Sequence, residues 1–144
     1  MKRIVIDASV VLKWYLSDEE HGDMALDILE YHASDRLSLH APALLEFEVA
    51  NGLAIARKRA RVGDDDALKA MDGFAGLGIG IYPLSSLFPK ILFYCNKYDI
   101  SAYDAAYVAL ADDLKTDFIT ADKRLFNSTR ELGFVKWIGE FQGK

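Results

Sequence analysis

The sequence has little cysteine, little proline and no long hydrophobic run. One of its 144 residues is cysteine and three are proline. The lone Cys95 excludes an internal disulfide and any zinc site that needs several cysteines, and it favours a reducing compartment. The apolar runs are shorter than the ~20 residues that cross a bilayer, and Asp7 follows the first run too early for a signal peptide. We therefore expect a cytoplasmic protein without a membrane span.

A basic excess is also missing. The net charge is −5, whereas proteins that bind nucleic acid over a broad surface are usually basic. Setting aside the four candidate acids introduced below changes this charge from −5 to −1. Four cations gather in one segment, which predicts either a phosphate-binding patch or a solvated helix end, and the sequence leaves both open. They are Arg57, Lys58, Arg59 and Arg61.

The alternation of apolar and amphipathic segments predicts one α/β domain that spans residues 1–144. Hydrophobic residues make up 51% of the chain and charged residues 27%, which is typical of a globular protein. Short apolar strands between amphipathic helices predict a parallel sheet covered on both faces, with its ligand site beyond the carboxyl ends of the strands. The predicted strands are 4–7, 37–40, 79–82, 117–120 and 134–138, and the predicted helices are 10–16, 18–33, 43–59, 64–77, 86–97, 102–114 and 123–132.

Glu48 is unusual because helical periodicity turns it toward the core. At about 100° per residue from Leu44, Glu48 falls near ~40° and the bulky apolar side chains centre near ~65°, whereas Glu46 falls near ~200°. An acid on a core-facing stripe is unfavourable unless it is paired, protonated or bound to metal. The pattern therefore predicts a functional Glu48 and an ordinary surface Glu46.

Three further acids have both a functional and a structural interpretation. Asp7 and Asp122 each follow a predicted strand, where a binding site is expected, but a turn residue or a helix N-cap is also common there. Asp104 follows Ser101 at the spacing of a capping box, and it also shares one helix face with Val108. Spacing alone leaves these alternatives open.

Four converging carboxylates suit Mg²⁺ or Mn²⁺, which prefer oxygen ligands. Such ions support phosphodiester hydrolysis by activating water and by offsetting charge on the leaving oxygen. The three histidines, at positions 21, 32 and 40, have no spacing typical of a site. The acids therefore predict a metal-dependent nuclease.

Four segments together resemble the PIN-domain ribonucleases, and most closely the VapC-type toxins of prokaryotic toxin–antitoxin pairs. They cover nearly the whole chain and are Ile6-Asp7-Ala8-Ser9, Glu48-Val49-Ala50-Asn51-Gly52-Leu53, the run SAYDAAYVALA at 101–111, and Ile119-Thr120-Ala121-Asp122-Lys123-Arg124-Leu125. The resemblance implies a Rossmann-like, three-layer α/β/α sandwich with a five-stranded parallel sheet.

The same resemblance implies a site and partners. Its catalytic and metal-binding residues would be Asp7, Glu48, Asp104 and Asp122, around Mg²⁺ or Mn²⁺. Ser9, Asn51 and Thr120 would orient these carboxylates through hydrogen bonds. Some members of the family carry a further acid shortly after the fourth one, but here Lys123 and Arg124 follow Asp122, and these two cations could contact RNA phosphates instead. The implied activity is endoribonuclease cleavage of structured RNA, and the implied partners are a small VapB-like antitoxin and a second copy of the chain.

Three alternatives compete with a ribonuclease toxin. The first is a PIN-family nuclease in RNA maturation, and the second is a PIN-like module that binds RNA or protein without cutting. The third is a response-regulator receiver, which needs paired acids after the first strand and a phosphoacceptor Asp after the third. Here Asp7 stands alone and Pro83 follows 79–82, so the receiver is disfavoured.

Overall fold

Five parallel strands form the centre of the computed structural model, which describes residues 1–142. Their order across the sheet is β3-β2-β1-β4-β5. The strands are β1 (Lys2–Ile6), β2 (Leu37–Pro42), β3 (Gly80–Tyr82), β4 (Asp117–Thr120) and β5 (Val135–Trp137). The chain proceeds outward from β1 to β3 and then restarts at β4 on the other side of β1. The topological switch point therefore lies between β1 and β4, where α/β sheets commonly bind ligands.

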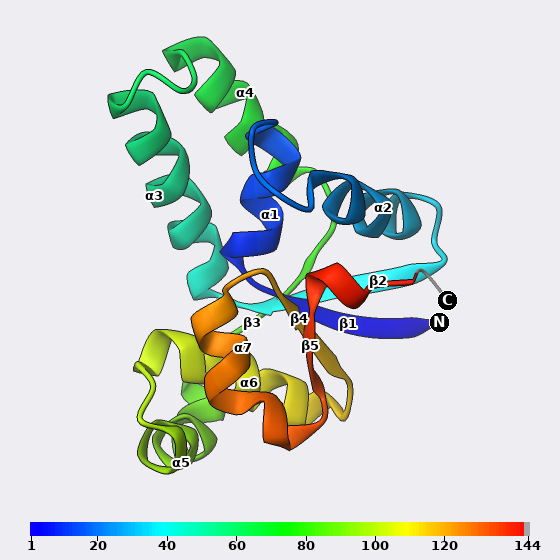
Figure 1. Cartoon of the computed structure of the whole chain (residues 1–144), viewed down its shortest axis with the longest axis vertical. Coiled ribbons are helices and arrows are strands. Elements are labelled where there is room, and N and C mark those ends of the chain that lie inside the picture. Colours follow the sequence, from blue (N-terminus) through cyan, green and yellow to red (C-terminus); the bar gives the residue numbers. More distant parts are fainter. Residues whose placement is uncertain (143–144) are drawn as a thin grey trace.

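Helices cover both faces of this sheet, as Figure 1 shows. One face carries α1 (Ala8–Tyr15), α2 (Gly22–Ala33), α3 (Leu44–Lys58) and α4 (Asp64–Ala75). The other carries α5 (Phe88–Tyr98), α6 (Ala102–Leu114) and α7 (Lys123–Thr129). This division follows from right-handed crossovers, because the direction of travel across the sheet reverses after β3. The three-layer α/β/α sandwich with a five-stranded parallel sheet is thus confirmed.

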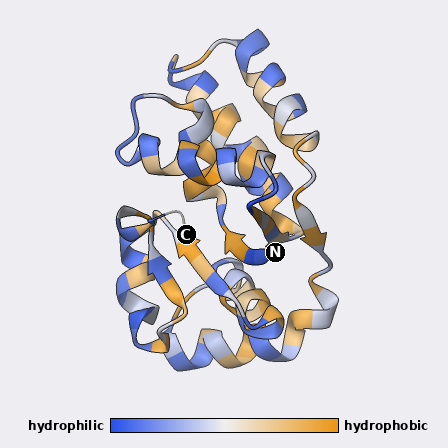
Figure 2. Ribbon diagram, turned by 90° about the vertical axis from the view of Figure 1, so that its right-hand side faces the viewer, coloured by the Kyte–Doolittle hydropathy of each residue, from blue (hydrophilic) through white to orange (hydrophobic). Residues whose placement is uncertain are grey.

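The register of β1 and β4 determines which residues emerge together at the end of the sheet. Ile4 pairs with Asp117 and Ile6 with Ile119, so Asp7 and Thr120 come next, side by side. The strands read as continuous apolar segments because both faces are covered. Val5, Ile6, Leu39 and Phe118 are fully buried, and Figure 2 shows hydrophobic ribbon concentrated in the strands. A packed sheet therefore fixes the positions of the residues that leave its carboxyl edge.

Three helices begin or end differently from the sequence expectation, and the others are shifted by no more than two residues at either end. The predicted helix 18–33 begins only at Gly22, because His21 has a left-handed backbone (φ +60°) and residues before it form turns. The predicted helix 86–97 is a 3-10 turn, η1 (Ser85–Leu87), followed by α5, whose first turn holds Pro89. The predicted helix 123–132 ends as α7 at Thr129 and continues as the 3-10 turn η2 (Arg130–Leu132). A third 3-10 turn, η3 (Ile138–Glu140), follows β5. Proline lacks the N–H that a helix interior needs, so it starts a helix more readily than it continues one.

None of the helices within residues 1–142 combines the length and the apolar character that a bilayer span requires.

Candidate active site

Asp7 leaves the end of β1 and is only 6% exposed. Ser9 Oγ donates a hydrogen bond to its Oδ1 (2.5 Å), and Thr120 Oγ1 donates one to its Oδ2 (2.6 Å). Burial raises the pKa of Asp7 to about 6, the hydrogen bonds from Ser9 and Thr120 partly oppose this, and the charge of Asp122 adds to it. Asp7 is therefore a carboxylate held in position at an energetic cost.

The two hydroxyls that bind Asp7 also bind the segment after β4. Ser9 Oγ accepts from the backbone N–H of Ala121 (2.9 Å), and Thr120 Oγ1 accepts from that of Asp122 (3.0 Å). Each hydroxyl thus donates to Asp7, which follows β1, and accepts from the backbone that follows β4. The structure places Ser9 and Thr120 where they orient Asp7 and Asp122 together.

Asp122 caps α7 with one carboxylate oxygen. Its Oδ1 accepts from the backbone N–H of Leu125 (3.1 Å), as an N-cap does. Within the described residues its Oδ2 has no hydrogen-bond partner. The capping interpretation of the sequence is correct, but it leaves one oxygen of Asp122 for another ligand.

Glu48 is half-buried on α3, and the neighbouring Glu46 is exposed, in agreement with the helical periodicity. The Tyr107 hydroxyl donates a hydrogen bond to Glu48 Oε1. Burial raises the pKa of Glu48, the hydrogen bond from Tyr107 lowers it, and the charge of Asp104 raises it. Glu48 therefore faces the other acids rather than solvent.

Asp104 lies in the first turn of α6 with its side chain 22% exposed. Its backbone N–H donates to Ser101 Oγ (3.1 Å), so the predicted cap is present and uses the backbone of Asp104. Burial and the charge of Asp122 raise the pKa of the Asp104 carboxyl, whereas Arg124 and Ser101 lower it. Arg124 Nη2 lies 3.6 Å from Asp104 Oδ2. The carboxylate is thus oriented toward the same cluster as the other acids.

The four acids interact as a chain of like charges. Asp122 raises the pKa values of both Asp7 and Asp104, and Asp104 raises that of Glu48. Asp7 and Asp122 follow β1 and β4, and Glu48 and Asp104 lie on α3 and α6, so the acids are grouped near the carboxyl edge of the sheet, where they affect one another's pKa values in pairs. Such a cluster attracts a cation, because a cation relieves the repulsion that each carboxylate imposes on the next.

The donor set fits Mg²⁺ or Mn²⁺ in kind, since every donor is a carboxylate oxygen. Within residues 1–142 no three His, Cys, Asp or Glu side chains approach closely enough to form a ready-made cation site. Mg²⁺ does not require one, because it usually keeps several waters and contacts only one or two carboxylates directly. One or two of these acids would hold the ion directly, and the others would add negative charge around it.

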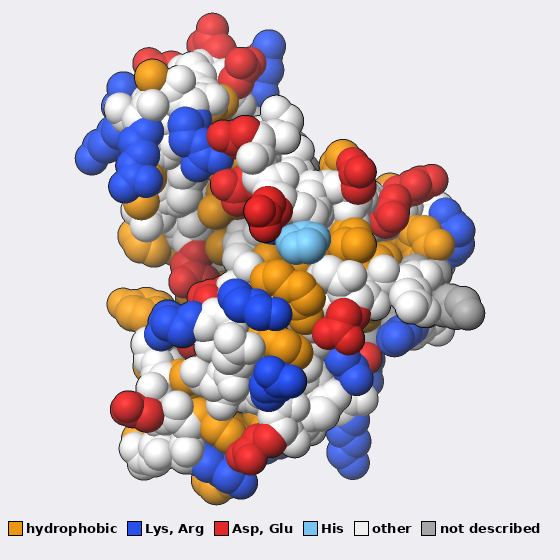
Figure 3. All heavy atoms as spheres, viewed as in Figure 1, with side chains coloured by type: hydrophobic (Ala, Val, Ile, Leu, Met, Phe, Trp, Pro, Cys, Tyr) orange, Lys and Arg blue, Asp and Glu red, His pale blue; other side chains and the backbone are white. Residues whose placement is uncertain are grey.

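Two of the remaining predictions concern Asn51 and the cationic segment 57–61. Asn51 is exposed and makes no side-chain hydrogen bond to any part of the chain that the structure describes. The cationic segment lies at the far end of α3, ~14 Å beyond Glu48 along the helix axis at 1.5 Å per residue, and Figure 3 shows Lys and Arg side chains gathered over that end. Arg57 pairs with Asp64 (3.2 Å) and Arg61 with Asp18 (2.7 Å) and Glu19 (2.9 Å), while Lys58 and Arg59 are exposed.

Tyr107 was not predicted from the sequence as a site residue. It is 2% exposed, stacks on Phe118 with 5.7 Å between ring centroids, and contacts Glu48 from α6. The available signal was its position three residues after Asp104, on the same helix face. A buried tyrosine needs a hydrogen-bond partner, and here the partner is a site acid.

Comparison with known proteins identifies the family of this chain. The model of the PIN domain family matches residues 4–132. Ribonuclease VapC9 of Mycobacterium tuberculosis is 37% identical over 122 residues, which cover 85% of this chain and 87% of VapC9.

Two solved structures share the fold. VapC20 of Mycobacterium tuberculosis, described as a toxin that cleaves the sarcin–ricin loop, has a TM-score of 0.64 at 14% identity, over 92% of this chain and 96% of VapC20. A toxin–antitoxin complex from Klebsiella pneumoniae contains a chain with a TM-score of 0.57 at 16% identity, over 85% of this chain and 89% of that one. By its sequence and its fold, this chain belongs to the PIN-domain family and, within it, to the VapC ribonucleases.

Proposed function

We propose that this protein is the endoribonuclease toxin of a toxin–antitoxin pair and that it uses Mg²⁺ or Mn²⁺ to hydrolyse structured RNA in the cytoplasm. The proposal is supported by the positions of Asp7, Glu48, Asp104 and Asp122 near the carboxyl edge of the sheet, where the charges of Asp122 and Asp104 raise the pKa values of neighbouring acids. Within residues 1–142 no histidine or cysteine forms a hydrogen bond with these acids, and acids alone suffice for metal-assisted phosphodiester hydrolysis.

In this proposal the four acids hold the ion and other side chains hold the acids. When bound, the divalent ion supplies an activated water and charge compensation for the scissile phosphate. Ser9 and Thr120 fix the orientation of Asp7, and Tyr107 fixes that of Glu48. Hydrogen bonds of this kind orient metal ligands and tune their basicity.

The proposed partners are RNA, a small VapB-like antitoxin and a second copy of the chain. The antitoxin is supported by the VapC relatives and by the Klebsiella pneumoniae complex. The homodimer is supported by large hydrophobic side chains that are exposed on α3 and α5, such as Phe47 (77%) and Leu92 (63%). Light scattering on the purified protein measures the dimer directly.

A matched pair of variants on one helix tests the activity. Wild type, Glu48→Gln and Glu46→Gln are incubated with total RNA in Mg²⁺, in Mn²⁺ and in EDTA, and the fragment ends are mapped. We expect metal-dependent cleavage by the wild type and by Glu46→Gln, and a loss of at least ~100-fold in Glu48→Gln.

The control removes the same charge from the solvent-facing side of α3, so it separates the site from general electrostatics. Cleavage in EDTA, or equal cleavage by both variants, would contradict the proposal. Isothermal titration with Mn²⁺ then separates a binding module from an enzyme, because a non-catalytic module that lacks the metal site shows no binding.

A further inference from the structure

A strip of alternating cations and aromatic rings runs along α7 and β5, and we call Lys123, Phe126, Arg130 and Trp137 the α7–β5 strip. The first three follow one another at helical spacing, so they share one face, which points toward Trp137 on β5. Figure 3 shows Lys and Arg side chains over α7 beside a hydrophobic patch. The strip therefore presents positive charge and ring surface together.

The cations of the strip make cation–π contacts with its aromatic rings. Lys123 Nζ lies 4.5 Å from the Trp137 ring centroid and 5.3 Å from that of Phe126. The Arg130 guanidinium lies 5.7 Å from the Phe126 centroid, and the two rings are 6.0 Å apart. Both cations are exposed and both rings are only partly buried. Such contacts also occur where aromatic rings only pack against the fold, but partly buried rings beside exposed cations suit a ligand that carries both bases and phosphates.

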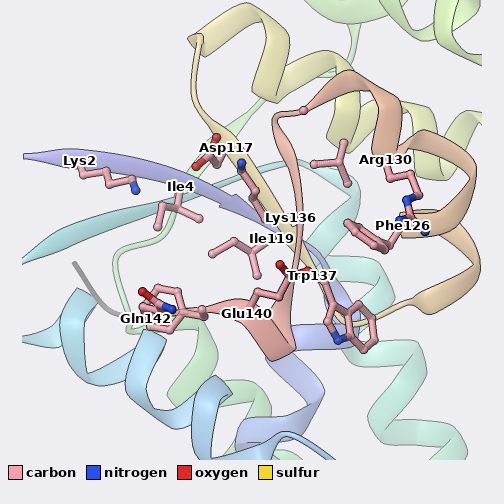
Figure 4. Close-up of a pocket in the computed structure, with 13 residues that line it drawn as sticks. Lys2, Ile4, Asp117, Ile119, Phe126, Arg130, Lys136, Trp137, Glu140 and Gln142 are labelled. Atoms are coloured by element: carbon pink, nitrogen blue, oxygen red, sulfur yellow. The ribbon is translucent and has the colours of Figure 1, made fainter.

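A cavity of about 570 Å³ adjoins the strip. Figure 4 shows Phe126, Arg130 and Trp137 at one end of it and Lys2 at the other. Lys136 also lines it, as do two acids, Asp117 and Glu140. The cavity gives space for a group the size of a nucleoside next to the rings of the strip.

The strip is continuous with the acid cluster. Lys123 directly follows Asp122, and Arg124 lies 3.6 Å from Asp104. Residues 123–129 contain two cations and no acid. By contrast, two of the four cations at the end of α3 are engaged by acids of their own chain. Of the two cationic surfaces, the α7–β5 strip is the one that lies beside the acids.

We propose that the α7–β5 strip binds the unpaired RNA strand that leaves the acid cluster, with bases stacked on Trp137 and Phe126 and phosphates contacting Lys123 and Arg130. Single-stranded RNA is recognised in this way because every base offers a face for stacking and every linkage a charge. The inference rests on the proposed ribonuclease function and extends it to the chemistry of substrate binding.

Tryptophan fluorescence gives a direct test, because the chain has only two tryptophans. In Trp14→Phe the remaining emission comes from Trp137. Titration with an RNA hairpin that carries a single-stranded tail, in buffer without divalent cations, should quench about half of this emission or more, and a fully paired RNA of equal length should quench much less. RNA is not cut under these conditions, so failure of binding and failure of the cleavage proposal appear in different experiments.

A second measurement does not depend on Trp14. In the wild-type background, Lys123→Ala/Arg130→Ala should make the negative slope of log affinity against log salt shallower by ~1.4, because each phosphate contact to single strands contributes ~0.7 to its steepness. The rival double variant Lys58→Ala/Arg59→Ala removes the same charge from the end of α3 and should leave the slope unchanged. The proposal is overturned if the salt slope becomes shallower only in Lys58→Ala/Arg59→Ala. It is also overturned if an acidic peptide quenches the emission of Trp137 and the tailed RNA does not.

Discussion

Replacing Asp7 by asparagine should stabilise the metal-free protein while abolishing RNA cleavage. Burial and Asp122 raise the pKa of Asp7 from its ordinary 3.8 to about 6. At 1.36 kcal/mol per pKa unit this difference makes the ionised carboxylate unfavourable by ~3 kcal/mol. Asparagine avoids that charge, but it offers one acceptor where Asp7 offers two, so one hydroxyl loses its acceptor at ~1 kcal/mol. The net gain is ~1–2 kcal/mol.

The size of this stabilisation depends on pH. Above about pH 6 Asp7 is ionised in both the folded and the unfolded chain, and the full penalty applies to the folded state. As pH falls through 6 toward 3.8 the folded state takes up the proton first, so the penalty disappears. Asp7→Asn should therefore raise Tm by ~2–8 °C at pH 7 and by little at pH 4.

Thermal unfolding in EDTA at pH 7 and at pH 4 measures the change in Tm, and Asp27→Asn is the control. Asp27 is an exposed acid on α2, so its replacement changes the net charge equally without relieving burial. Saturating Mg²⁺ should reduce or reverse the gain, because it stabilises only the chain that binds it. A variant that is less stable than wild type at pH 7, or equally stabilised at both pH values, would refute the account of Asp7 as a strained carboxylate.

Two further variants address the residues that hold the acids. Tyr107→Phe keeps the stack on Phe118 but removes the hydrogen-bond donor to Glu48. The kcat for RNA cleavage should fall ~10–100-fold, while the free energy of unfolding changes by ~1 kcal/mol or less. A variant with the same kcat as wild type would show that this hydrogen bond has no role in cleavage. Thr120→Val leaves Asp7 Oδ2 and the N–H of Asp122 without their partner, so urea denaturation should show a loss of ~1–3 kcal/mol that Thr120→Ser largely restores.

The features that the sequence determined are local ones. Glu48 could be separated from Glu46 because helical periodicity acts over a few residues and needs no knowledge of the partner that Glu48 meets. Asp122 as an N-cap and Ser101 as the cap of α6 were likewise visible, since the donor and acceptor lie three residues apart. The layered parallel sheet could be predicted from the alternation of strands and helices, because that pattern too can be read from neighbouring residues.

Only the tertiary structure decided which side chains meet. Tyr107 and Glu48 are separated by 59 positions, and Ser9 reaches Ala121 across 112. The cations of residues 57–61 looked equivalent in the sequence, yet Arg57 and Arg61 are paired with acids whereas Lys58 and Arg59 are exposed. The proposed strip on α7 depends on Trp137, which belongs to the strand beside it. Periodicity tells which way a side chain points from its own element, but sheet order and helix packing bring distant elements together, and those contacts have no local signal.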